Sequence, residues 1–210
     1  KLYKAVSKKG SVVEFTAQNE QTLTRWILGI LKTEGKMITS GAMKQFLEKT
    51  GTDMERIRQE LEKLICYCME KESITEEDVA VICSEQTENK IFDMINAMAE
   101  KKQKKAMELY YDLLALKEPP MRILYLITRQ FNLLMQVKEL SEEGYSAKTI
   151  SERLKMAGFI VRNCLRQAEY FSLKTLKEAL QDCVRMEEAV KTGRMNDVMS
   201  VELLLVKYSS

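Results

Sequence analysis

Apolar residues recur at helical spacing along almost the whole chain. Between residues 53 and 71, one face of a 3.6-residue repeat carries five apolar positions: Ile57, Leu61, Leu64, Ile65 and Cys68. Similar stripes predict helices over residues 18–35 and 40–49, and another that starts after Thr75. We therefore expect a small helical bundle over residues 16–85.

The second half of the chain repeats this pattern over longer segments. Stripes predict helices around residues 91–98, 106–114, 120–140, 146–158, 159–171, 172–191 and 197–208. The polar stretch 84–89 separates them from the first bundle, and we place a domain boundary there. The fold class expected is all-α, with a small bundle followed by a larger helical domain at 86–210.

Local signals mark where these helices begin and end. Asp53, Ser146 and Ser172 stand at expected N-caps, and Thr75 with Asp78 three residues later resembles a capping box. Pro119-Pro120 fits a helix start, and Gly35 and Gly193 fit helix ends. These residues set helix boundaries independently of the stripes.

The first fifteen residues differ from the rest. Residues 1–6 read as the tail of a helix, and residues 12–15 as a short strand. A lone strand leaves its backbone groups unpaired. We therefore expect residues 1–15 to be the remnant of an upstream α/β domain.

Composition narrows the function classes. The 210 residues are 45% hydrophobic and 30% charged, with a net charge of +2, which predicts a globular protein without a strong nucleic-acid footprint. The absence of histidine removes Ser-His-Asp and Cys-His chemistry and histidine-ligated metal sites. Five scattered cysteines and no long apolar run favour reduced thiols in a cytoplasm and no membrane span.

Motifs for chemistry are incomplete. Gly29 to Gly35-Lys36 has five intervening residues and no following hydroxyl, so a helix-ending glycine explains it better than a P-loop. Lys191-Thr192-Gly193 lacks the Ser-x-x-Lys partner of penicillin-binding enzymes. Cys66 and Cys68 face apart on a helix. We therefore predict no catalytic, cofactor-binding or metal site.

A polar group within the most hydrophobic predicted helix is harder to assign. Arg129-Gln130-Phe131 lies in the 120–140 helix, where an arginine either edges the helix or anchors a subunit interface. Both interpretations stay open. The candidate partner-interface residues are Arg129, Gln130, Phe131, Lys191 and Arg194.

Several short segments, in order along the chain, resemble the delta subunit family of the bacterial DNA polymerase III clamp loader. They are Lys1–Lys4, Trp26-Ile27, Glu60–Leu64, Ile74-Thr75 with Asp78-Val79, Asn89–Asp93, Glu118–Pro120, Arg129–Phe131, Gln167-Ala168 and Lys191–Gly193. The chain departs from the family at Gly158, where many members carry proline.

The resemblance implies a non-catalytic subunit of a DNA-directed DNA polymerase holoenzyme. Residues 1–15 would be the end of a truncated AAA+-like domain, 16–85 a helical lid and 86–210 a helical collar. The collar would join the gamma/tau and delta prime subunits into the loader that places the sliding clamp on primed DNA. The clamp itself would contact the missing N-terminal domain, and DNA would be bound weakly or through the complex.

Two other classes compete with this hypothesis. A helical protein-protein adaptor unrelated to replication would show the same apolar stripes. A small helical enzyme would need a nucleophile, phosphate or metal constellation, which the sequence does not supply. Co-elution with loader subunits and an activity screen discriminate among the three.

Overall fold

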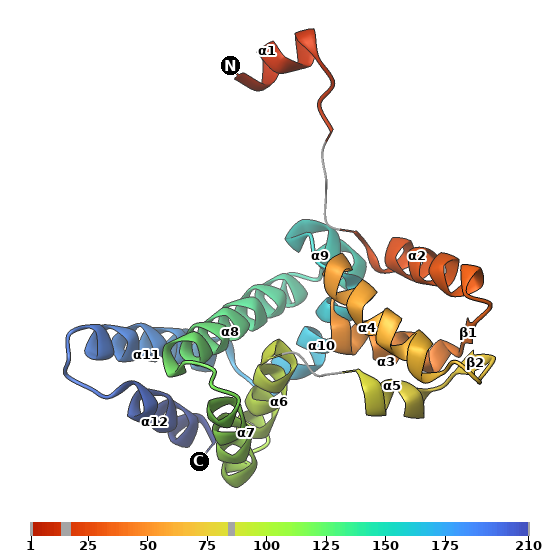
Figure 1. Ribbon diagram of the computed structural model, residues 1–210. Helices are drawn as coiled ribbons and strands as arrows, with labels where there is room; N and C mark the ends of the chain where they lie inside the picture. The colour runs from red at the N-terminus through yellow and green to blue at the C-terminus, as the bar shows by residue number, and fades with distance from the viewer. Residues whose placement is uncertain (1, 14–17, 84–86, 210) are drawn as a thin grey trace.

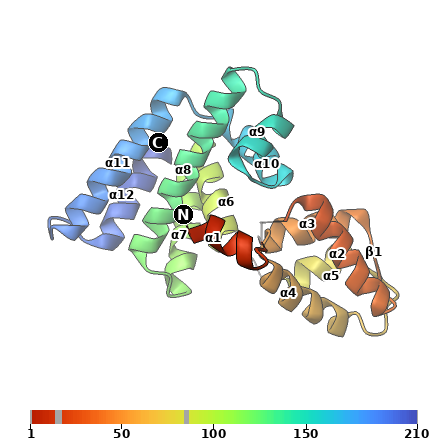
Figure 2. The ribbon, with the colours of Figure 1, turned by 90° about the horizontal axis from the view of Figure 1, so that it is seen from above.

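The computed structural model describes residues 2–13, 18–83 and 87–209. Twelve helices and two very short strands form in these ranges, which confirms the all-α fold class. Figures 1 and 2 show the helices in two groups, α2 to α5 and α6 to α12. Each group has its own hydrophobic core, one between Leu23 and Cys83 and the other between Ile91 and Tyr208.

The smaller group, called the lid below, is residues 18–83. Its elements are α2 (Glu20–Thr33), β1 (Met37–Ile38), α3 (Ser40–Thr50), α4 (Met54–Tyr67), β2 (Ser73–Ile74) and α5 (Glu76–Ile82). The five apolar residues expected on one face of α4 point into the core, four of them fully buried and Ile65 partly buried. The amphipathic pattern therefore identified the packing face correctly.

One lid feature was not predicted. β1 and β2 form a parallel pair in which Met37 lies opposite Ser73 and Ile38 opposite Ile74. Helix α4 ends at Tyr67 rather than at Lys71, and the chain turns through residues 68–72 to reach β2. Two-residue strands carry no periodic signal, so this pairing could not be predicted from the pattern of apolar residues.

The larger group, called the collar below, is residues 87–209. Its elements are α6 (Thr87–Ala99), α7 (Gln103–Ala115), α8 (Pro120–Glu142), α9 (Ala147–Leu154), α10 (Gly158–Ala168), α11 (Leu173–Lys191) and α12 (Asp197–Ser209). The long helix α8 lies at its centre and packs against α6, α9, α10, α11 and α12 (Figure 1). Most apolar residues of α8 therefore pack inside the collar.

The predicted caps are present. Asp53, Ser146 and Ser172 each accept a hydrogen bond from the backbone N–H three residues later, at 2.9, 3.3 and 3.0 Å. Pro119 occupies the N-cap of α8 and Pro120 its first turn. Gly158 begins α10, a position that proline also tolerates, so the departure from the family pattern leaves this helix start intact.

The N-terminal segment stands apart from both cores. Helix α1 (Leu2–Lys9) has no buried residue and projects away from the two groups (Figure 1). The helical tail expected over residues 1–6 is present from Leu2 and continues to Lys9. Val12 and Val13 are exposed and have no strand conformation, while Glu14 and Phe15 of the expected strand lie outside the described residues.

Candidate functional site: a cleft between lid and collar

A cleft of about 950 Å³ separates the lid from the collar. Its lid wall is the end of α3, the turn Gly51–Asp53 and the first turn of α4. Its collar wall comes from α6, α8 and α10. The two units touch beside it, where Asn89 donates from its side-chain amide to the carbonyl oxygens of Glu48 at 3.0 Å and Lys49 at 3.3 Å.

Helix α8 presents one face to this cleft. Four lining residues of this helix follow helical spacing, at i, i+4, i+7 and i+11: Arg122, Leu126, Arg129 and Leu133. Helix α10 adds Ile160, Asn163 and Arg166, at i, i+3 and i+6, which spread over a broader face. Two neighbouring helices therefore give the collar wall alternating apolar and cationic positions.

The arginines of the collar wall differ in their contacts. Arg122 forms an ion pair with Glu118, with 3.1 Å between Nη1 and Oε2. Arg166 donates to the side-chain oxygen of Asn163 at 2.6 Å, and its side chain is exposed. Arg129 is exposed as well. The interface candidate Arg129 thus lies on a solvent-accessible wall, where a partner could reach it.

Gln130 and Phe131 have a different role. Gln130 donates to the side-chain oxygen of Gln167 at 2.7 Å, and the buried Gln167 amide donates in turn to the carbonyl oxygen of Phe92 at 2.9 Å and to Asn96 Oδ1 at 2.7 Å. This network ties α8, α10 and α6 together. Gln130 is therefore a half-buried internal crosslink rather than a free interface side chain.

Phe131 is fully buried, and its assignment to a partner surface was wrong. Its ring packs edge-on to Phe171 and tilted against Tyr208, each with 6.0 Å between ring centroids. The sequence run Arg-Gln-Phe spans three directions around a helix, because successive residues are about 100° apart. Of the three, Arg129 is exposed, Gln130 is half-buried and Phe131 is buried.

Lys191 and Arg194 lie at the turn between α11 and α12, away from the cleft lining. Both are exposed, and each pairs with a nearby carboxylate: Lys191 with Glu187 at 2.5 Å and Arg194 with Glu188 at 2.7 Å. The turn is closed by Gly193 at φ 71°, a left-handed conformation that glycine adopts easily. The glycine therefore ends α11 as expected.

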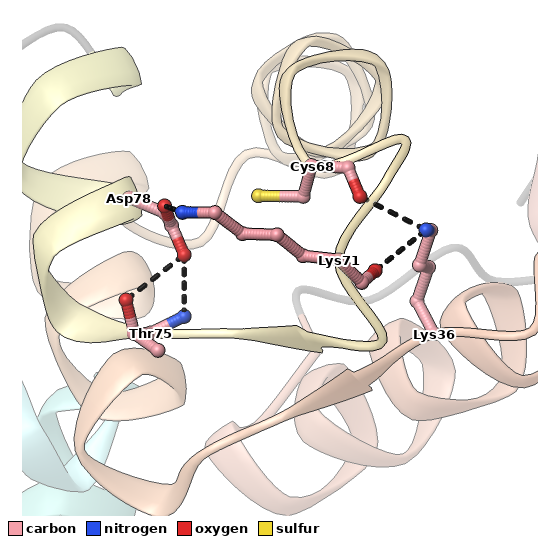
Figure 3. Close-up of polar contacts among 5 residues, drawn as sticks. All are labelled: Lys36, Cys68, Lys71, Thr75 and Asp78. Atoms are coloured by element: carbon pink, nitrogen blue, oxygen red, sulfur yellow. Dashed lines mark hydrogen bonds and ion pairs between the residues drawn. The ribbon is translucent and has the colours of Figure 1, made fainter.

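The region around Lys36 is structural. Lys36 Nζ donates to the carbonyl oxygens of Cys68, Met69 and Lys71, at 2.9, 2.7 and 2.6 Å, so it caps α4 at Cys68 and holds the turn that follows. Figure 3 shows the bonds to Cys68 and Lys71. Gly35 ends α2 at φ 65°. Its left-handed φ and its position directly after the C-cap Glu34 confirm the interpretation of Gly35 as a helix-ending residue.

Asp78 of α5 stabilises the segment between α4 and α5 (Figure 3). Its carboxylate accepts from the Thr75 N–H and hydroxyl, both at 2.9 Å, and from Lys71 Nζ at 2.6 Å. These bonds, with that from Lys71 the largest, lower the pKa of Asp78 from 3.8 to about 2. The capping box predicted for α5 is present.

The thiols are placed as the sequence indicated. Cys66 is exposed, whereas Cys68, Cys83, Cys164 and Cys183 are buried. Burial raises the pKa of Cys83, Cys164 and Cys183 to about 11. Across residues 2–13, 18–83 and 87–209, no group of three or more Cys, Asp or Glu side chains is arranged to hold a metal ion.

No helix of the described residues combines the length and apolar content that crossing a membrane requires.

Sequence reasoning missed the α10 half of the collar wall. Arg166 and Ile160 come from a helix that lies beside α8 only in the folded collar. The seven-residue spacing of Arg122 and Arg129 was the available signal for the α8 half, since it places both on one face.

Comparison with known proteins assigns the fold to a family. Residues 88–208 match the model for the DNA polymerase III delta subunit, C-terminal domain. The chain is 31% identical over 207 residues to DNA polymerase III subunit delta of Bacillus subtilis, covering 99% of this chain and 60% of that protein. It is 25% identical over 142 residues to the probable delta subunit of Aquifex aeolicus, covering 67% of this chain and 41% of that protein.

A solved structure supports the same family assignment. The Bacillus subtilis DNA clamp loader delta protein superposes with a TM-score of 0.81 at 31% identity, over 100% of this chain and 62% of that one. The chain thus spans about three fifths, or less, of the length of these relatives. The resemblance seen in the short segments is confirmed by these matches, and the chain belongs to the DNA polymerase III delta subunit family.

Proposed function

We propose that this chain is a non-catalytic part of a bacterial clamp loader and that its collar joins the other loader subunits. The observation that carries the proposal is the agreement of both units, lid and collar, with the delta clamp loader protein at a TM-score of 0.81. The partners would be the gamma/tau and delta prime subunits. The assembled loader would place a sliding clamp on primed DNA in the cytoplasm.

Apolar surface on the collar supports an assembly role. Helix α12 exposes Met199, Leu203 and Val206 at i, i+4 and i+7, with 51, 44 and 39% of each side chain accessible. Helix α8 contributes less than its sequence suggested, because Ile123, Ile127 and most of its other apolar residues lie in the core. We therefore propose α12, rather than α8, as the main apolar contact.

The proposed contact needs more than one helix. Stable protein interfaces bury roughly 1,200 Å² or more in total, so polar neighbours must take part. The exposed cations of the collar are the proposed polar contacts: Lys191 and Arg194 at the turn that leads into α12, and Arg129 separately on the cleft wall. Arginine is enriched at such interfaces because its planar group forms several hydrogen bonds at once.

The test is co-elution of this chain with purified gamma/tau and delta prime subunits in size-exclusion chromatography. We expect a complex with the wild-type chain and its loss in Leu203→Glu, which places a charge in the α12 stripe. Leu28→Glu is the matched control, because Leu28 is similarly exposed, at 46%, but lies on the lid. A wild-type chain that stays separate from every loader subunit would refute the proposal and favour an adaptor unrelated to replication.

A further inference from the structure

We propose that the collar wall of the cleft binds an amphipathic, acidic segment of a neighbouring loader subunit. This inference rests on the proposed function and adds to it a binding site and the chemistry of the occupant. The residues of this wall that carry the inference are Arg129 and Leu133 on α8 with Ile160 and Arg166 on α10. It is distinct from the apolar stripe of α12.

The wall offers apolar contact area at its base. Leu133, Ile160 and Met156 pack against the collar core but are only partly buried. Phe92 of α6 also lines the cleft and is half-buried. A polypeptide segment with apolar side chains on one face would remove this surface from water, at about 25 cal/mol for each Å² of apolar area covered.

Arg129 and Arg166 give the collar wall positive charge that their described contacts do not neutralise. The contact described for Arg166 is to the neutral Asn163 side chain, and among the described residues neither Arg129 nor Arg166 forms an ion pair. Guanidinium groups bind carboxylates through two parallel hydrogen bonds. An incoming segment would therefore gain most from carboxylates flanking its apolar side chains.

The same cleft disfavours a nucleic acid as its occupant. Glu48, Asp53 and Asp93 line it as well, and their carboxylates would repel a continuous row of phosphates. The net charge of the chain is only +2. The lining also holds the cations Lys49, Arg56 and Arg122, so its charge is mixed. A segment with separate acidic residues matches a lining of mixed charge better than a continuous row of phosphates does, and this favours a protein partner.

The first experiment uses the double variant R129E/R166E in the reconstituted loader. We expect the affinity for the other subunits to fall by at least about tenfold, because like charges then face each other. The matched control is K105E/K174E, which makes the same change in net charge at exposed collar positions outside the cleft. Far-UV circular dichroism of both variants checks that the helices are intact.

The second experiment keeps both arginines. A photoreactive p-benzoylphenylalanine replaces Leu133, and the complex is irradiated with and without primed DNA. We expect a crosslink to a loader segment in which acidic and apolar residues alternate, identified by mass spectrometry.

Each outcome decides a separate point. Co-elution of the wild type together with unchanged affinity of R129E/R166E, or with no crosslink from position 133, overturns the cleft site and leaves the assembly role standing. A crosslink to DNA alone overturns the choice of a protein partner. Failure of the wild type to co-elute overturns the assembly role and, with it, this inference.

Discussion

Asp78 offers the sharpest test of how the lid is stabilised. Its carboxylate, 3% accessible, joins the start of α5 to Lys71 in the segment before β2. Asp78→Asn preserves the shape of the side chain and removes its charge. The substitution therefore isolates the electrostatic part of these contacts from the packing part.

The magnitude follows from the pKa of Asp78. A decrease from 3.8 to about 2 corresponds to at most about 2.4 kcal/mol of folding free energy. The side chain of Lys71 is 54% accessible, so solvent screening reduces this to about 1–2 kcal/mol. Because the folded pKa is depressed, the contribution is present above pH 4 and is lost as the pH falls from about 4 to about 2.

Trp26 makes the measurement specific to the lid. It is the only tryptophan of the chain, and it packs against the lid core. Urea unfolding followed by tryptophan fluorescence should show Asp78→Asn destabilised by about 1–2 kcal/mol at pH 7 and by almost nothing near pH 2. Glu77→Gln, at an exposed position of the same helix, is the control. An equal difference at both pH values would refute the electrostatic explanation.

Three further predictions concern other contacts. Lys36→Met should destabilise the lid by about 1–3 kcal/mol in the Trp26 transition, since the Met69 and Lys71 carbonyl oxygens lose the Lys36 donor and the Cys68 carbonyl oxygen keeps only the Lys71 N–H. An unchanged midpoint would contradict the capping role. Phe131→Ala should lower collar stability by about 3–5 kcal/mol in urea unfolding followed by circular dichroism, and a neutral effect would argue against its place in the core. Ellman's reagent should modify Cys66 promptly in the native protein and the buried thiols only after unfolding, whereas rapid reaction of several thiols would contradict their burial.

Helix positions could be read from the sequence because their causes are local. The Asp53 carboxylate bonds the backbone three residues later, and Gly193 relieves strain within its own turn, so neighbours in the chain are sufficient. The apolar stripe of α4 belongs to the same class of signal. The stripe indicates which face of the helix is apolar, although its burial still depends on the neighbouring helices.

Contacts between distant residues were outside the reach of the sequence. The pairing of β1 with β2 and the capping of α4 by Lys36 join segments more than thirty residues apart. The α10 wall of the cleft depends in the same way on how α10 docks against α8. A pattern of neighbouring residues does not specify which segments, so far apart in the chain, come into contact.

The run Arg129-Gln130-Phe131 shows most clearly which properties the sequence determined and which the tertiary structure decided. Its sequence by itself established a helix and marked the polar pair as unusual among apolar neighbours. Only the tertiary structure decided that Phe131 is core, Gln130 an internal crosslink and Arg129 part of the cleft wall. The physical reason is that backbone hydrogen bonds and caps act within about four residues, whereas burial depends on which helices pack together.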